Sequence, residues 1–237
     1  MTGRLLLPVV SFEPVTPWSR QLTLDLGTRS FAFDAGQAVY LGRADQSVRK
    51  PYSIACAPGD AAADRRLEFL IAADPNAPPE PHLADLSAAT PVEVSGPVGR
   101  FVLPAPLPGS ALFVAGGTGI APLRAMLRHL LAASPEAHAG VVHAARTAAD
   151  FAYADELRRL ANTGRIRLSV SASREPRDSG WTGQRGRLTA DDLRPHLGGV
   201  PVPPVCFVCG PPGFVTHVTA LLGSLGVPPD RIRREEW

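Results

Sequence analysis

Three glycines, Gly116, Gly117 and Gly119, fall in the stretch "FVAGGTGIAP" between a short apolar run and an amphipathic segment. If the run is a strand and the segment a helix, the backbone amides of this turn can bind the pyrophosphate of a dinucleotide. The stretch is neither a Gly-x-Gly-x-x-Gly nor a Walker A motif, because no Gly-Lys-Ser or Gly-Lys-Thr follows. The pattern favours a nucleotide site, with a merely tight strand–helix turn as the alternative.

A second turn, "CGPPGF", ends another apolar run with Cys209, Gly210 and Pro211. Ligands of open parallel sheets bind at the carboxyl ends of the strands, so we expect Cys209 at the same cleft as the glycine turn. A buried cysteine that only packs is the alternative. Cys206 and Cys209 have the spacing of a redox or zinc pair, but a separation of three in a strand places two side chains on opposite faces. Because the 6 histidines are also scattered, no metal site is predicted.

The segments that must position these residues show two different sequence patterns. Up to about residue 103, short alternating stretches such as "QLTLDL" and "PVEVSG" are separated by turn residues, which is typical of a small antiparallel β-barrel. After the proline-rich stretch 103–110, apolar strands alternate with amphipathic helices, which indicates a doubly wound, mostly parallel sheet. We therefore predict two domains, a β-barrel at 1–106 and an α/β domain at 107–237.

Composition excludes several classes of protein. A net charge of +2 does not suggest a protein that binds nucleic acid or a membrane surface. No apolar run approaches the ~20 residues of a membrane helix, and the start of the chain lacks the features of a signal peptide. Three cysteines fit a reducing compartment, so we expect a cytoplasmic protein.

The only lysine of the chain, Lys50, lies directly before Pro51, Tyr52 and Ser53 in "KPYSIACAP". In an arginine-rich sequence one lysine can survive by chance, so its neighbours decide whether it has a role. This motif and four others, "GPVGRF", "VAGGTGIAP", "SRE" and "CGPPGF", resemble in order the ferredoxin–NADP reductase superfamily over essentially the whole chain. In that family a flavin-binding barrel precedes a nicotinamide-binding α/β domain, which matches the two sequence patterns.

For the flavin, the resemblance assigns residues 50–53 to the family motif Arg-x-Tyr-Ser. In that motif the cation binds the FAD diphosphate, the tyrosine packs on the isoalloxazine and the serine hydrogen-bonds near flavin N5. Lysine in place of arginine loses the bidentate fork, and Arg49 is a second cation that strand alternation points away. Ala77 and Glu80 replace the glycine and serine of the family's Gly-x-x-Ser segment, and a carboxylate is a poor neighbour for phosphate. The other implied flavin contacts are Leu70, Ile71, Ala72, Pro81, His82 and Leu83.

For the nucleotide, the resemblance assigns the pyrophosphate of NAD(P)H to Gly117, Thr118, Gly119 and Pro122. The 2′-phosphate of NADPH would be bound by Ser173 and Arg174, with Arg146 bordering the same pocket. Arginine suits such a dianion, so NADPH is favoured over NADH, and a solvated loop cation is the alternative for Arg174.

The last residues, "RREEW", match the family's terminal Glu-x-aromatic at Glu235 and Trp237. The resemblance implies that the ring of Trp237 covers the flavin face where the nicotinamide stacks, so this end must move. Packing on the barrel is the alternative. Ser53 and Cys209 would flank hydride transfer, with Glu235 as a polar neighbour and Gly210 and Pro211 beside the nucleotide.

The resemblance implies an FAD-dependent oxidoreductase that takes a hydride from NAD(P)H. Many members carry an iron–sulfur domain, for which this chain has neither the length nor the cysteines, so we expect a separate acceptor: ferredoxin, flavodoxin or an oxygenase component. Two alternatives stay open. One is a flavin reductase that uses free flavin as its substrate, which the altered diphosphate segment supports. The other is an electron-transfer subunit of a larger complex.

Overall fold

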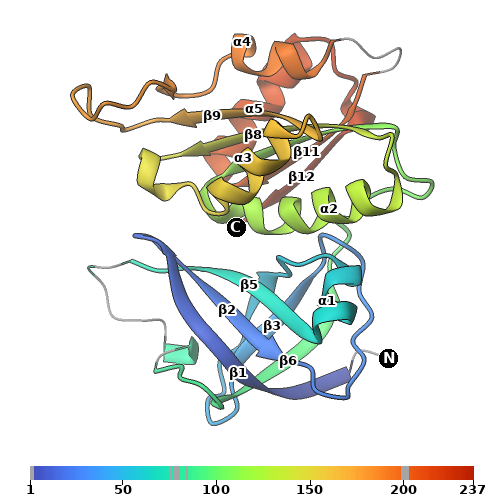
Figure 1. The fold of residues 1–237 in the computed structure, drawn as a ribbon, viewed down its shortest axis with the longest axis vertical. Helices are drawn as coiled ribbons and strands as arrows, with labels where there is room; N and C mark the ends of the chain where they lie inside the picture. Colours follow the sequence, from blue (N-terminus) through green and yellow to red (C-terminus); the bar gives the residue numbers. More distant parts are fainter. Residues whose placement is uncertain (1–2, 75, 77–80, 84, 199–202) are drawn as a thin grey trace.

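Two six-stranded sheets, one above the other in Figure 1, organise the chain. The structure, a computed structural model, describes residues 3–74, 76, 81–83, 85–198 and 203–237. The first sheet is antiparallel with the strand order β4-β3-β6-β1-β2-β5, and the second is parallel with the order β10-β9-β8-β7-β11-β12. The predicted combination of an antiparallel barrel and an α/β domain is confirmed.

Strands of the first sheet alternate between a buried and an outward face, as their sequences predict. On β2, Leu22 and Leu24 have no exposed surface and point into the barrel. A bridge between Ile54 and Phe69 connects the two outer strands, β4 and β5, and so closes the barrel. The strands are β1 (Gly3–Thr16), β2 (Ser19–Asp25), β3 (Ala38–Arg43), β4 (Lys50–Ser53), β5 (Arg66–Ala72) and β6 (Pro91–Val98).

The barrel also contains a helix, α1 (Pro58–Asp64), that the alternation of apolar and polar residues did not predict. Its start combines Pro58 in the first turn with Asp60, whose carboxylate accepts a hydrogen bond from the amide of Ala57 at 3.2 Å. Proline suits the first helical position, and the carboxylate satisfies an amide that the helix leaves unpaired. A short 3₁₀ turn, η1 (Pro81–Leu83), precedes β6.

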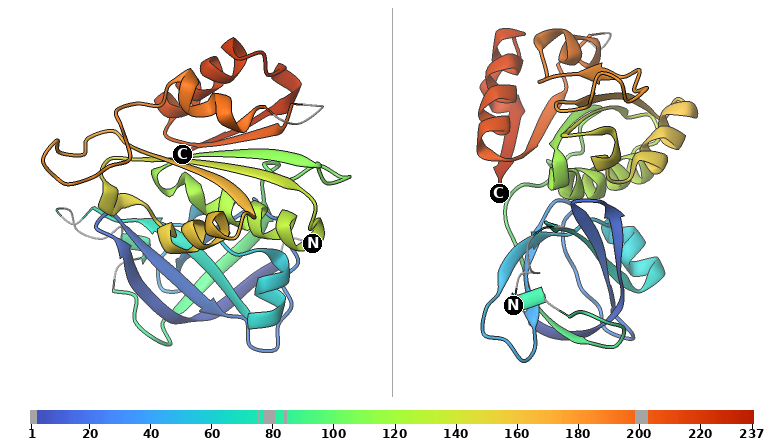
Figure 2. Two further views of the ribbon diagram at one scale, coloured as in Figure 1. Left: turned by 45° about the horizontal axis from the view of Figure 1, so that its top comes forward. Right: turned by 90° about the vertical axis from the view of Figure 1, so that its left-hand side faces the viewer.

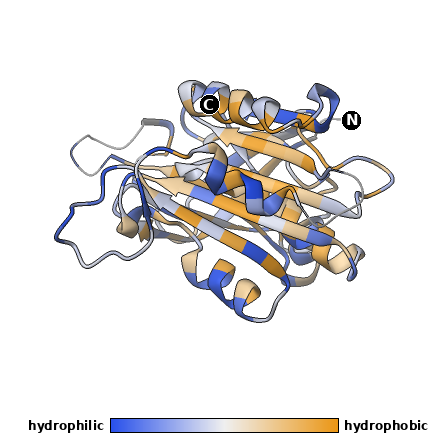
Figure 3. Cartoon of the chain, turned by 90° about the horizontal axis from the view of Figure 1, so that it is seen from above, coloured by the Kyte–Doolittle hydropathy of each residue, from blue (hydrophilic) through white to orange (hydrophobic). Residues whose placement is uncertain are grey.

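The central strands of the second sheet are nearly continuously apolar because helices cover both faces. β7 (Ser110–Gly116), in the middle of the sheet, is buried over six of its seven residues, and Figure 3 shows how hydrophobic these strands are. The other strands are β8 (His138–Ala145), β9 (Ile166–Ala172), β10 (Gln184–Arg185), β11 (Val205–Gly210) and β12 (Ile232–Glu236).

Helices α2 (Ile120–Ala133) and α3 (Ala154–Asn162) pack on one face, and α4 (Ala190–Leu193) and α5 (Pro212–Ser224) pack on the other. Cys209 belongs to the core under α2, whereas Cys206 belongs to the core under α5. The two thiols therefore face opposite sides of the sheet, as the spacing predicted. The 3₁₀ turns of this half are η2 (Gly117–Gly119), η3 (Ala148–Asp150), η4 (Arg194–His196) and η5 (Pro229–Arg231).

One apolar core runs across the junction of the two halves. Ala55, Leu70 and Phe101 from the barrel side join the same cluster as Met126 and Leu127 of α2. Figure 2 shows α2 lying against the barrel, with the C-terminus close to the junction. The predicted boundary between residues 106 and 107 lies in the connector between β6 and β7 and stays a prediction. Within the described residues, no helix is long and apolar enough to cross a membrane.

Candidate active site

Three of the predicted residues meet where β4 of the barrel approaches the carboxyl ends of β11 and β12. The Ser53 hydroxyl donates a hydrogen bond to Oε2 of Glu235 at 3.4 Å. Glu235 is the direct register partner of Cys209 in the parallel pair β11–β12. Residues that are far apart in the sequence therefore share one place between the domains, at the sheet edge where α/β proteins bind ligands.

Burial controls the protonation of this group. Desolvation raises the pKa of Glu235 above its ordinary value, and the hydrogen bond from Ser53 offsets part of that rise. Desolvation, followed by the charge of Glu235, raises the pKa of the Cys209 thiol. Cys209 is therefore a neutral thiol, and Glu235 retains its proton to a higher pH than an exposed glutamate does.

The three cysteines are expected to resist alkylation in the folded protein. Cys56, Cys206 and Cys209 are all buried, and desolvation raises the pKa of each thiol, so little thiolate is present at pH 8. Iodoacetamide followed by mass spectrometry should find no modified cysteine in the native protein and complete modification in urea. Rapid native alkylation of Cys209 would show that its surroundings are open and polar, contrary to this structure.

The glycine turn lies directly behind Cys209. A Cβ on Gly119 would collide with the carbonyl oxygen of Cys209 and would lie 2.6 Å from its carbonyl carbon. Gly117 has a φ of +56°, in the left-handed region that glycine adopts easily. Pro122 is buried in the first turn of α2. The turn therefore keeps the backbone open to a ligand and close to β11.

A buried histidine hydrogen-bonds to the backbone of this turn. The residues around it in the sequence did not predict that contact. His143 of β8 has no exposed surface, and its Nε2–H donates to the carbonyl of Gly117 at 3.1 Å. Desolvation lowers the pKa of His143 to about 4, so the ring is neutral at physiological pH.

The other predicted nucleotide residues follow β8 and β9. The amide of Arg174 donates to the carbonyl of Arg146 at 2.6 Å, and the hydroxyl of Ser173 donates to the carbonyl of Ala145 at 3.1 Å. The side chains of Arg146 and Arg174 are exposed. The guanidinium of Arg146 lies 5.0 Å from the ring centroid of Trp18, which belongs to the turn between β1 and β2. Sequence reasoning missed Trp18, because nothing in the β1–β2 turn indicates a partner on the other domain.

The predicted flavin motif forms β4. Lys50 and Pro51 are exposed, and Tyr52 is partly buried. The Tyr52 hydroxyl and His82 Nε2 share a hydrogen bond of 2.8 Å, and the two rings stack with an interplanar angle of 26°. Arg49 pairs with Glu93 of β6, with an Nη2–Oε2 distance of 3.1 Å.

The other predicted flavin contacts differ in their exposure. Leu70 is buried in the core between the domains, Ile71 and Leu83 are buried in the barrel, and Ala72 is exposed. Pro81 lies in η1, whereas Ala77 and Glu80 lie outside the described residues. Trp237 follows β12, is 56% exposed, and donates its amide to the carbonyl of Gly210 at 3.4 Å. Flavin contact by any of these residues stays a prediction.

The available groups fit a flavin and a nicotinamide nucleotide. The short strand β4 presents an exposed ammonium, a tyrosine ring and a hydroxyl, which suit a phosphate, a planar ring and a polar ring edge. On the α/β side of the junction, Gly119 has no Cβ, and this lets the glycine turn lie against the backbone of Cys209 in β11. No group of three or more potential metal ligands occurs among the described residues.

Comparisons with known proteins identify the family of this chain. A family model described as "Oxidoreductase NAD-binding domain" matches residues 113–220. Ferredoxin–NADP reductase B of Sorangium cellulosum is 34% identical over 97% of this chain and 96% of its own length. The propane 2-monooxygenase reductase component of Gordonia sp. is 30% identical over 94% of this chain and 65% of its own length. The Amycolatopsis cytochrome P450 reductase GcoB has a TM-score of 0.83 and 27% identity over 99% of this chain and 69% of that chain.

The chain belongs to the ferredoxin–NADP reductase superfamily, and it is an oxidoreductase. The cofactors of this class are FAD and NAD(P)H. Several relatives are longer, since the chain spans only 43% of the flavohemoprotein of Rhodopirellula baltica.

Proposed function

We propose that the protein transfers a hydride from NAD(P)H, with NADPH favoured, to bound FAD and then passes electrons to a separate acceptor. The observation that carries this proposal is the contact between Ser53 and Glu235, with Cys209 beside it. This contact joins β4, which carries the predicted flavin motif (the flavin strand), to β11 and β12 of the parallel sheet. The flavin accepts electrons as a pair and can release them singly.

Each group at the junction has a role in this proposal. Lys50 binds the FAD diphosphate, and Tyr52, held by His82, orients the isoalloxazine. The amides at residues 117–119 and the start of α2 bind the nucleotide pyrophosphate. Ser53 and Cys209 flank the reacting atoms and exclude water, while Glu235 accepts a hydrogen bond from Ser53 beside them. Trp237 covers the flavin and moves aside when the nicotinamide enters.

The separate acceptor is an electron-carrier protein, ferredoxin or flavodoxin, or an oxygenase component. The names of the Sorangium and Gordonia relatives support this inference. The functional test is reduction of cytochrome c through added ferredoxin, driven by NADPH without added flavin. We expect turnover that depends on ferredoxin. Turnover of NADPH that leaves added ferredoxin and flavodoxin oxidised would contradict an electron-carrier acceptor.

A second candidate is a reductase of free flavin, which the altered diphosphate segment favours, because Ala77 and Glu80 replace the family's glycine and serine there. The two candidates differ in how the flavin behaves during gel filtration. The proposed function predicts that FAD elutes with the protein and that activity persists without added flavin. Loss of all flavin, with activity restored only in proportion to added flavin, would favour the second candidate. Turnover only within an assembled complex would favour an electron-transfer subunit.

Coenzyme choice is expected to depend on Arg174. Arg174→Ala should lower kcat/KM for NADPH by about tenfold or more, because a charge-assisted hydrogen bond contributes ~1.5–3 kcal/mol, and it should change kcat/KM for NADH less than about twofold. The matched control is Arg177→Ala, an exposed cation on the same loop, which should change neither value. An equal fall with both coenzymes would show that Arg174 does not bind the 2′-phosphate.

A further inference from the structure

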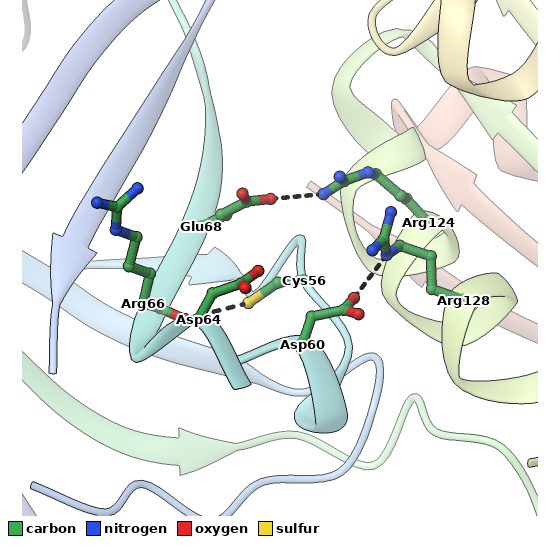
Figure 4. Close-up of a pocket in the computed structure, with 7 residues that line it drawn as sticks. All are labelled: Cys56, Asp60, Asp64, Arg66, Glu68, Arg124 and Arg128. Carbon is green, nitrogen blue, oxygen red and sulfur yellow. Dashed lines mark hydrogen bonds and ion pairs between the residues drawn. The ribbon is translucent and has the colours of Figure 1, made fainter. Parts of the chain in front are cut away.

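A buried arginine on α2 connects the two halves of the proposed site. Arg124 is 8% exposed, and its Nη1 donates to the carbonyl of Ala55 at 2.9 Å and to Oε2 of Glu68 at 2.7 Å. Its Nε donates to Oε2 of Glu156 on α3 at 2.8 Å, and its guanidinium lies 4.4 Å from the ring centroid of Tyr153. Figure 4 shows this side chain extending from α2 toward β5 of the barrel.

Arg124 and its acceptor Ala55 both lie close in sequence to the predicted cofactor-binding segments. Arg124 lies on the helix that begins immediately after Gly119, the last residue of the glycine turn. Ala55 follows Ser53, the last residue of the flavin strand, by two positions. One guanidinium therefore links the segment that would hold the nucleotide to the segment that would hold the flavin.

A neighbouring arginine extends the link into a network. Arg128, one turn further along α2, donates to Asp60 of α1 at 2.5 Å and to Glu156 at 3.0 Å. Burial alone would lower the pKa of Arg124, but the carboxylates of Glu156 and Glu68, with Tyr153, raise it above its usual value, so the guanidinium stays charged. The network lines a hollow of about 20 Å³, which is large enough for one water molecule.

Apolar contact and ion pairs do different things at this junction. The core that contains Leu70, Phe101 and Met126 holds the domains together, but hydrophobic attraction has no preferred direction. A buried guanidinium with fixed acceptors adds little net stability, yet it imposes one geometry on the groups around it. The ion pairs are thus suited to fixing the relative orientation of the two domains rather than to stabilising the contact between them.

We propose that Arg124 is a positioning residue that fixes the distance and angle between the glycine turn and the flavin strand, and thereby sets the rate of hydride transfer. This inference rests on the proposed function. Two planar rings must be held in a near-attack arrangement, and a misplacement of ~1 Å can cost about 10²-fold in rate. Loss of the link should therefore slow the transfer without weakening either cofactor's binding to the same degree.

The test compares Arg124→Met, which keeps the aliphatic stem, with the matched control Arg158→Met on the exposed side of α3. Anaerobic stopped-flow mixing of the FAD-loaded protein with NADPH measures the limiting rate of flavin reduction and the nucleotide Kd separately. Amide hydrogen exchange of the same proteins without nucleotide measures the junction independently of activity. Glu68→Gln, which keeps the size of the acceptor, serves as the second variant if Arg124→Met does not fold.

We expect Arg124→Met to lower the limiting rate by about tenfold or more, with the Kd values for NADPH and FAD within about threefold of the wild type. We also expect faster exchange of peptides that cover residues 54–57, and no change in Arg158→Met. An unchanged limiting rate would overturn the proposal, and so would a loss explained entirely by weaker cofactor binding. If the wild type itself does not reduce its flavin, the proposed function fails, whereas unchanged exchange in Arg124→Met refutes the link itself.

Discussion

Gly119→Ala is expected to weaken nucleotide binding severely, and so to slow reduction of the flavin by NAD(P)H, while FAD remains bound. An added Cβ would overlap the carbonyl of Cys209 and lie 2.9 Å from the amide nitrogen of Gly210, both of them backbone atoms. Backbone of a central strand cannot move aside as a flexible side chain can, so the glycine turn must shift. The amides of that turn are the proposed pyrophosphate ligands, and a hydrogen bond to a charged group contributes ~1.5–3 kcal/mol, so loss of two should lower nucleotide affinity by about 10²-fold or more. Isothermal titration of the FAD-loaded variant with NADP⁺ measures this loss.

The matched control for this change is Gly223→Ala in α5. Its Cβ would meet nothing within 4 Å, and alanine in a helix is more stable than glycine by ~0.5–1 kcal/mol. The control should bind NADP⁺ as the wild type does and melt at an equal or slightly higher temperature. Wild-type nucleotide affinity in a folded Gly119→Ala protein would show that the turn does not bind the nucleotide.

The second large effect is expected at the hydrogen bond between Ser53 and Glu235. Ser53→Ala removes the only hydroxyl donor that the described structure places on Glu235, and loss of one preorganised donor at a reacting centre lowers rates by about 10²-fold. Stopped-flow reduction by NADPH at saturating nucleotide should show this loss, with the FAD content unchanged. Ser224→Ala, at the end of α5, is the control and should keep the wild-type rate.

Glu235→Gln separates the effect of charge from that of shape. Desolvation raises the pKa of Glu235 above 4.5, so the folded state keeps a proton that the unfolded state has released. This carboxyl therefore costs stability as the pH rises from its ordinary pKa through its raised pKa, and the cost is complete above that window. Glu235→Gln should be more stable than the wild type near neutral pH and equally stable in acid, by urea unfolding at several pH values. A stability difference that does not change with pH would contradict the raised pKa.

Much of the fold could be predicted because local pattern and tertiary structure agree. Period-two stretches became the barrel, and near-continuous apolar runs became a sheet covered on both faces. The helix α1 escaped prediction because "PGDAAAD" has no apolar stripe, and its stability comes from a proline start and a carboxylate cap. The family motifs also predicted that Ser53, Cys209 and Glu235 would lie together; the register of β11 and β12 pairs Cys209 with Glu235, and Ser53 hydrogen-bonds to Glu235 from β4.

The contacts that could not be predicted all cross between elements that are remote in sequence. An arginine beside Leu123 and Met126 in α2 looks like an edge of the apolar face, and its burial depends on carboxylates that arrive from β5 and α3. His143 lies in an apolar strand, and the hydrogen-bond partner of its ring comes from the turn after β7. Such pairings follow from the way the elements pack together, which single-element patterns do not encode.

The measurement that tests the account most directly is an anaerobic titration of the freshly purified protein with NADPH, followed by its visible flavin absorbance. Denaturation of the same sample and chromatography of the released cofactor identify the flavin. We predict a yellow protein that releases stoichiometric FAD and is fully bleached by an equimolar amount of NADPH. A colourless protein that oxidises NADPH only with added free flavin would contradict bound FAD. A protein that oxidises no nicotinamide nucleotide with any flavin would contradict the whole account.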